Sequence, residues 1–249
     1  MRYFLLIIST FCAGLPLLIP VTNNAHAQPV ILENFMGFDC VYSLQKTDIL
    51  KKIRDRKDTL TLNCHLTIDQ GENEYALQAC SQKRGHYVVR DITTGQETPY
   101  SVINGRYKSV GADPGIHISA INLAKKETPL ISFPLKIDNK TLMAELPRID
   151  TEAPLDLWLY AYDFENKIVH KKGNARMGSD IPHGMFRNMV KKLDKLGDWH
   201  GYQESIAIPL HDFRADGFAL IAQEQYGGPI LALGKIEPGL SSQTSRSQN

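Results

Sequence analysis

A single cysteine, Cys40, has the sequence surroundings of a reactive thiol. It follows a short apolar strand, Val30–Phe35, and a turn at Met36–Asp39, and it opens a lysine-rich amphipathic segment that predicts a helix. A thiol at a helix N-terminus faces unpaired backbone N–H groups and the positive end of the helix dipole, which together favour the reactive thiolate. We therefore expect Cys40 to attack as a nucleophile.

The position three residues after Cys40, where a dithiol redox motif carries its second cysteine, holds Ser43. Because serine cannot close a disulfide, this motif cannot run the two-electron cycle of a C-x-x-C protein. The pattern predicts a monothiol mechanism in which Cys40 attacks a disulfide or accepts glutathione and Ser43 hydrogen-bonds the thiolate. The resolving thiol would come from Cys80, from Cys64 or from a second molecule.

The first 27 residues have the pattern of a secretory signal peptide. Arg2 precedes an apolar stretch from Tyr3 to Ile19, and Ala25-His26-Ala27 is a small-x-small cleavage site. We expect an exported protein, secreted into a bacterial periplasm, with no transmembrane segment after cleavage. Since Cys12 would leave with the signal peptide, three cysteines would remain, and an odd number in an oxidising compartment leaves one thiol free or paired with another molecule.

Charge and histidine spacing argue against several other functions. Lys+Arg 28 against Asp+Glu 27 gives a net charge of +1, which provides no global field for nucleic acid. The chain has no H-x-x-H or H-x-x-x-H spacing and no pair of C-x-x-C knuckles, so we expect no metal site of that kind and no cofactor. Cys40 with His65 leaves open a soft copper site, although a histidine satisfied by a backbone partner is the alternative interpretation of His65.

Two kinds of sequence pattern divide the chain. The first half predicts the order β-α-β-α-β-β-α, with a strictly alternating strand at Leu60–Ile68, a helix from about Glu72 to Arg84 that ends at Gly85, and a helix opened by Asp113-Pro114. Beyond Thr128 the pattern is of strands alone. This change predicts two domains, residues 28–127 and 128–238, followed by a disordered tail at 239–249.

A proline lies where the predicted fold would bring it near Cys40. Thr98-Pro99 precedes an apolar strand and an Asn104-Gly105 turn. We interpret Pro99 as a cis-proline, whose loop faces the reactive cysteine and offers backbone groups to an extended substrate. Thr98 would support this loop. The alternative is that Pro99 simply starts a strand, a position that tolerates proline.

Several motifs in one order resemble those of a known family, the secreted thioredoxin-like proteins of bacteria and plants known as domain of unknown function 1223. In the first half they include Glu33-Asn34-Phe35 with Cys40, His65, and Thr98-Pro99 to Gly105. In the second half the motifs are Gly173-Asn174-Ala175-Arg176, Asn188-Met189-Val190, Leu196 to Gly201 and Gly227-Gly228-Pro229-Ile230-Leu231. The resemblance implies an α/β thioredoxin-like domain with a mixed central sheet. We expect an all-β sandwich domain to follow this domain in the chain.

The family pattern would place cysteine at Ser43 and a proline after it, so the resemblance implies a dithiol that this chain lacks. Three functions follow. The first is an exported monothiol thiol-disulfide oxidoreductase that acts on protein disulfides or glutathione. The second is a binding or assembly module that has lost its catalytic dithiol. The third is a periplasmic copper-binding protein.

Overall fold

The structure is a computed structural model that describes residues 29–37, 53, 56, 58–66, 76–93, 97–111, 113–127, 129–164, 166–168, 184–186, 188–211 and 213–237. Cys40 and Ser43 lie outside these residues. So do the predicted signal peptide, most of the helix expected after Cys40, and the tail at 239–249.

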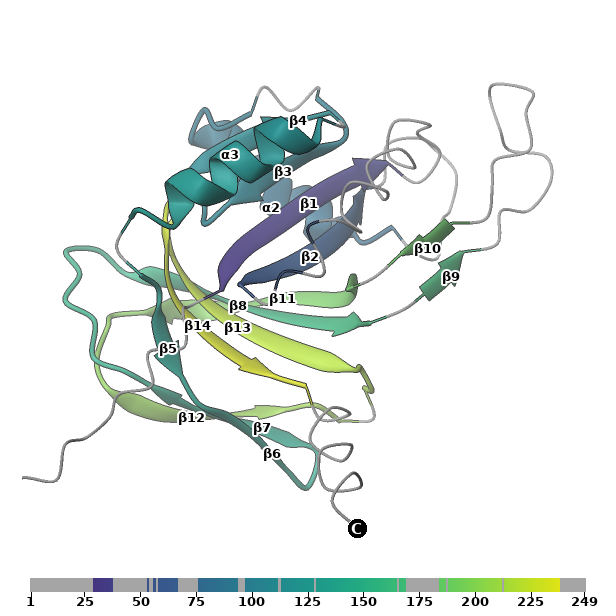
Figure 1. Ribbon diagram of the computed structural model, residues 1–249. Helices are drawn as coiled ribbons and strands as arrows, with labels where there is room; N and C mark the ends of the chain where they lie inside the picture. The colour runs from purple at the N-terminus through teal and green to yellow at the C-terminus, as the bar shows by residue number, and fades with distance from the viewer. Residues whose placement is uncertain are drawn as a thin grey trace, which may run out of the picture.

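Nine strands from both halves of the chain form one mixed sheet, in the order β4-β3-β1-β2-β11-β8-β13-β14-β5 (Figure 1). The strands are β1 (Val30–Gly37), β2 (Thr59–Leu66), β3 (Tyr100–Ile103), β4 (Tyr107–Val110), β5 (Ile131–Phe133), β8 (Leu155–Asp163), β11 (Met189–Trp199), β13 (Gly217–Glu224) and β14 (Ile230–Ile236). β2 runs parallel to both β1 and β11, whereas β8 and β13 run antiparallel to their neighbours.

The predicted fold class, a thioredoxin-like domain followed by a separate all-β sandwich, is therefore wrong. β11 pairs with β2 through Met189 and Asn63, and the Asn63 N–H donates to the Asn188 carbonyl at 2.9 Å. Without β11, β2 would present an open edge of unpaired backbone groups at the centre of the molecule. The sequence pattern does change near residue 128, from units that contain helices to strands alone. Strands from both sides of this change nevertheless belong to one sheet.

The sheet curls around the helix α2 (Gln78–Val89). Buried side chains of β1, β2, β8, β11 and β13 meet those of α2, including Cys80 and Tyr87, in one apolar core. The curl also brings the β3–β4 turn against the β13–β14 turn, where the Ile230 N–H donates to the Asn104 carbonyl at 3.0 Å. We call the face of the sheet that holds α2 the inner face.

Two further elements cover the outer face of the sheet (Figure 1). The helix α3 (Pro114–Ala124) packs on β1 and β3 through Ala120, Ile121 and Ala124. A three-stranded sheet of β12 (Glu204–Pro209), β7 (Thr141–Leu146) and β6 (Leu135–Asp138) packs on β8, β13 and β14 around Trp199. A ribbon of β9 (Asn166–Ile168) and β10 (Gly184–Phe186) completes the described strands.

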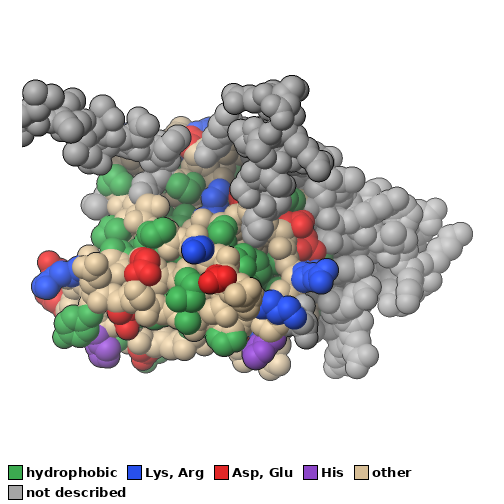
Figure 2. Space-filling view, turned by 90° about the horizontal axis from the view of Figure 1, so that it is seen from below, with side chains coloured by type: hydrophobic (Ala, Val, Ile, Leu, Met, Phe, Trp, Pro, Cys, Tyr) green, Lys and Arg blue, Asp and Glu red, His purple; other side chains and the backbone are tan. Residues whose placement is uncertain are grey.

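Figure 2 views the molecule from the side of the three-stranded sheet. Lys and Arg side chains are interspersed there with Asp and Glu, and neither sign dominates the described part of this face. None of the helices in the described ranges combines the length and apolarity needed to cross a membrane.

Local sequence signals define several elements correctly. The alternating strand is β2, and Asn104 and Gly105 have positive φ in the turn between β3 and β4. The Asp113 carboxylate accepts from the Gly115 N–H at 2.7 Å and caps α3, as predicted. The second predicted helix is displaced, because α2 continues through Gly85 to Val89 instead of ending there.

We expect Gly105→Ala to lower the free energy of unfolding by more than about 1 kcal/mol. Gly105 has a φ of +66°, and a Cβ there would collide with the Gly228 carbonyl oxygen on the opposite turn. Urea denaturation of the purified protein would measure the change.

The matched control is Gly85→Ala, since Gly85 is exposed within α2 and an added Cβ would meet no atom within 4 Å. This variant should be more stable than the wild type by about 0.5–1 kcal/mol. Equal effects of the two substitutions would contradict a close contact between the turns.

Candidate functional site

The carboxyl end of β1 is where the described chain comes nearest in sequence to Cys40. Gly37 is the last described residue before it and pairs with Leu66 of β2. Two residues earlier, Phe35 pairs with Cys64 on one side and with Tyr100 on the other, where the rings of Phe35 and Tyr100 stack with centroids 5.2 Å apart. Cys64, Phe35 and Tyr100 are therefore direct neighbours on the adjacent strands β2, β1 and β3, close to the predicted site.

Pro99 lies at this same end of the sheet, because it directly precedes Tyr100. The Thr98–Pro99 peptide is cis, as the sequence predicted. Pro99 is buried, and its carbonyl accepts from the Gly111 N–H at 2.9 Å. Thr98 is half-buried, and its hydroxyl donates to the Glu97 carbonyl at 2.8 Å.

A disulfide joins the two remaining predicted site cysteines, Cys64 of β2 and Cys80 of α2, across a Cα–Cα distance of 5.6 Å. Both residues are at most 1% exposed and lie in the inner core with Phe35 and Tyr100. While this bond is intact, neither cysteine offers a resolving thiol. The disulfide attaches the first turn of α2 to the sheet.

His65 follows Cys64 in β2 and is fully buried. Burial lowers the pKa of His65 to about 4, so the imidazole is neutral at physiological pH. Among the residues that the structure describes, no group of three or more His, Cys, Asp or Glu side chains is arranged to hold a metal ion.

A second constellation, which sequence reasoning missed, lies between α2 and the inner face of the sheet. We call it the Glu33 cluster, and it consists of Glu33, Lys83, Tyr87, Tyr160 and Gln223. The Glu33 carboxylate accepts hydrogen bonds from the hydroxyls of Tyr87 and Tyr160, and its Oε1 lies 3.9 Å from Lys83 Nζ. These contacts join β1, α2 and β8.

Gln223 of β13 completes the cluster. Its side-chain carbonyl accepts from Lys83 Nζ, while its Nε2 donates to the Tyr87 hydroxyl at 3.0 Å and to the Gly228 carbonyl at 2.7 Å. Lys83 Nζ also lies 4.2 Å from the centroid of the Trp158 ring, a cation–π distance. The ammonium group is thus held by a carboxylate, an amide and an aromatic face.

The electrostatics of the cluster follow from its burial. Burial lowers the pKa of Lys83 to about 8, against the opposing influence of the Glu33 and Asp156 carboxylates. Burial and the nearby Glu33 charge raise the pKa values of Tyr87 and Tyr160 well above 10. Both tyrosines are therefore protonated donors at physiological pH.

Every member of the Glu33 cluster is at most 1% exposed. Since a substrate in solvent cannot touch a group sealed in this way, the arrangement acts as a structural crosslink. One signal in the sequence could have revealed it, namely Glu33 standing alone as a charge within the apolar strand Val30–Phe35. No local signal identifies Lys83 or Gln223 as its partners.

Removing one donor from the buried carboxylate should be costly. We expect Tyr160→Phe to lower the free energy of unfolding by about 1–3 kcal/mol, because the buried Glu33 side chain would lose a hydrogen-bond donor that no water can replace. Urea denaturation at pH 7 would measure this. The control Tyr202→Phe, at a side chain that is 72% exposed, should change stability by less than about 0.5 kcal/mol. Equal small effects would contradict the assigned role of Tyr160.

The contribution of Lys83 to stability should rise with pH. The pKa of Lys83 is about 8 in the folded protein and 10.5 in the unfolded chain. Between these two values the unfolded chain binds more protons than the folded protein, so the free energy of unfolding increases as the pH rises. From pH 7.5 to 9.5 the wild type should gain stability relative to Lys83→Met, as measured by urea denaturation at each pH. Parallel pH profiles would contradict this.

Comparison with known proteins adds the family and the fold. No curated protein matches the chain in sequence. The crystal structure of a protein from Agrobacterium tumefaciens is similar, with a TM-score of 0.66 and 16% identity, over 85% of this chain and 95% of that one. HBP35 of Porphyromonas gingivalis is similar with a TM-score of 0.57 and 15% identity, over 85% of this chain and 75% of that one.

Each of these two structures aligns with 85% of this chain. The similarity therefore includes the sheet that both halves of the chain form, and it is not limited to one half. The family model described as "Protein of unknown function (DUF1223)" matches residues 31–223, a span from β1 into β13 that includes the whole Glu33 cluster. The chain therefore belongs to the DUF1223 family.

Proposed function

We propose that this protein is exported and uses Cys40 as a single reactive thiol toward the disulfides of other proteins. The observation that carries the proposal is the pairing of Cys64 with Cys80. If the predicted signal peptide removes Cys12, that pairing leaves Cys40 as the odd cysteine. Protein disulfides of this kind form and persist in oxidising compartments, which supports export.

The geometry at the carboxyl end of β1 supports a role for the Pro99 loop in binding the substrate. Gly37 precedes Cys40 by three residues, and the cis peptide at Pro99 directly precedes the adjacent strand β3 at the same end of the sheet. Backbone groups beside such a proline can pair with an extended polypeptide. The proposed substrate is therefore a disulfide carried on an extended segment of a partner protein.

The proposed reaction is one thiol–disulfide exchange. The Cys40 thiolate attacks one sulfur of the partner disulfide, a mixed disulfide forms, and the second partner sulfur leaves as a thiolate. Because Cys64 and Cys80 are bonded to each other and buried, resolution needs a thiolate from outside the chain, such as glutathione or a partner cysteine. That thiolate attacks the mixed disulfide and releases Cys40.

A redox-inactive binding or assembly module is the second candidate function. The same disulfide favours it, since both cysteines that might have resolved an intermediate are withdrawn from exchange. The two candidates differ in the reactivity of Cys40, which a binding module does not require.

Thiol titration would distinguish them. We expect one reactive thiol per native molecule, lost in Cys40→Ser, with a labelling rate whose pH midpoint lies below the ordinary cysteine pKa of about 8.5. Non-reducing gels of alkylated periplasmic extracts should show mixed disulfides with the wild type and none with Cys40→Ser.

The variant Ser43→Cys provides a contrast, because it supplies the missing resolving thiol. It should reduce the amount of trapped mixed disulfide and introduce dithiol reductase activity toward insulin. A labelling midpoint at or above about 8.5, with no adduct in the wild type, would contradict the redox proposal and favour the binding module.

A further inference from the structure

β4 is an edge strand whose outward backbone groups can be identified. Among the described strands it pairs only with β3, and the Gly111 N–H donates to the Pro99 carbonyl at 2.9 Å. Hydrogen-bonded and non-hydrogen-bonded pairs alternate along antiparallel strands. The N–H and C=O groups of Lys108 and Val110 therefore point away from β3, as a template for another strand.

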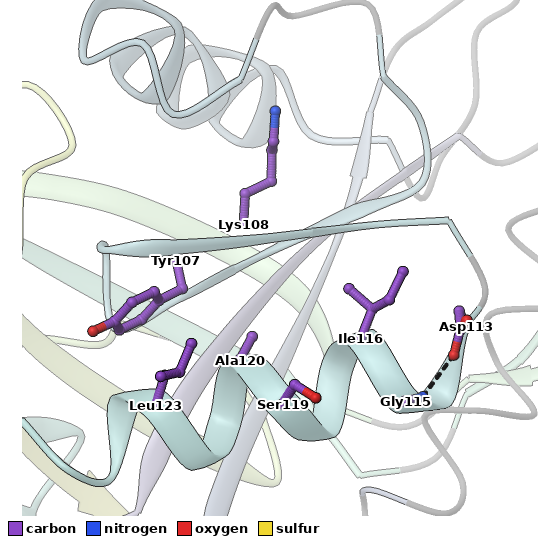
Figure 3. Close-up of a pocket in the computed structure, with 8 residues that line it drawn as sticks. All are labelled: Tyr107, Lys108, Asp113, Gly115, Ile116, Ser119, Ala120 and Leu123. Atoms are coloured by element: carbon purple, nitrogen blue, oxygen red, sulfur yellow. Dashed lines mark hydrogen bonds between the residues drawn. The ribbon is translucent and has the colours of Figure 1, made fainter.

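An apolar groove runs beside this edge, between β4 and α3, with a volume of about 470 Å³ (Figure 3). Ile116, Ala120 and Leu123 are the apolar side chains of its helical wall, with Ser119 among them, and the Tyr107 ring faces this wall from β4. Ile116 is 49% and Leu123 48% exposed, although both are large apolar side chains. They lie seven residues apart, which places them two turns apart on one flank of the helix.

The two ends of the edge strand carry opposite charges. Arg106 precedes β4, and Asp113 follows it at the N-cap of α3, and both side chains are exposed. A two-fold axis that makes two β4 strands antiparallel would bring the arginine end of one copy to the aspartate end of the other. The same axis would bring Ile116 near Leu123 of the second copy.

We propose that this protein forms a two-fold dimer in which β4 pairs antiparallel with β4 of a second copy. Val110 lies opposite Lys108 of the partner copy, so their outward N–H and C=O groups form the new main-chain hydrogen bonds. The two nine-stranded sheets become one continuous sheet, and the apolar flanks of the two α3 helices cover each other. The edge, the apolar flank and the charges are self-complementary, as an isologous interface requires.

Sedimentation velocity of the purified protein at micromolar concentrations tests the proposal. We expect a dimer for the wild type and at least ~10-fold weaker association for the double variant Ile116→Glu, Leu123→Glu, because each introduced carboxylate would be buried facing another across the axis. The matched control is Ile118→Glu, on the same helix and 38% exposed but outside the groove, which should remain dimeric. Circular dichroism would verify that each variant is folded.

A backbone variant tests the strand pairing separately. Val110→Pro removes an N–H that points away from β3, so the fold should tolerate it while association weakens, again by at least ~10-fold. A monomeric wild type at about 100 μM, a concentration far above a micromolar dissociation constant, would overturn the proposal. So would a dimer that all of these groove and edge variants leave intact, or a monomer that instead binds an added extended peptide at this edge.

Crosslinking tests the register in a Cys40→Ser background. Lys108→Cys chains mixed with Val110→Cys chains should give a covalent dimer on mild oxidation, because opposed residues in a hydrogen-bonded pair have Cα atoms about 5.5 Å apart. Neither variant alone should crosslink. Crosslinking of one variant with itself, and not of the mixture, would overturn this register.

Discussion

A carboxylate in the interior of a protein must be met by donors, and Glu33 meets its donors only in the curled sheet. Tyr87 comes from α2 and Tyr160 from β8, while Lys83 reaches both Glu33 and Gln223 of β13. A buried acid without such partners costs several kcal/mol. The position of α2 and the closure of the sheet around it are therefore conditions for burying one residue of β1.

This constraint explains why the two halves of the chain share a sheet. The residues that satisfy Glu33 lie on both sides of the pattern change near residue 128, and β11 covers the edge that β2 would otherwise expose. The buried disulfide between Cys64 and Cys80 fixes α2 at one end, and the Glu33 cluster fixes it further along. Both connect the helix to the inner face.

Local signals in the sequence predict much of the secondary structure and little of its assembly. Period-two alternation identifies β2, and Asp113 with Pro114 marks the start of α3, because these features act over a few residues. The cis peptide at Pro99 was also predicted correctly. Sheet order could not be predicted, since it depends on pairings such as Asn63 with Met189, and the reactive-thiol prediction at Cys40 falls outside the described residues.

The bond between Lys83 and Gln223 spans 140 positions of the chain. During synthesis from the N-terminus, α2 emerges long before β13. The side of α2 that packs on the sheet therefore stays uncovered until the last strands have formed. Cys80 lies on this side of α2. The disulfide between Cys64 and Cys80 is therefore enclosed only once strands from the second half of the chain are in place, and in the folded protein those strands shield it from reductants.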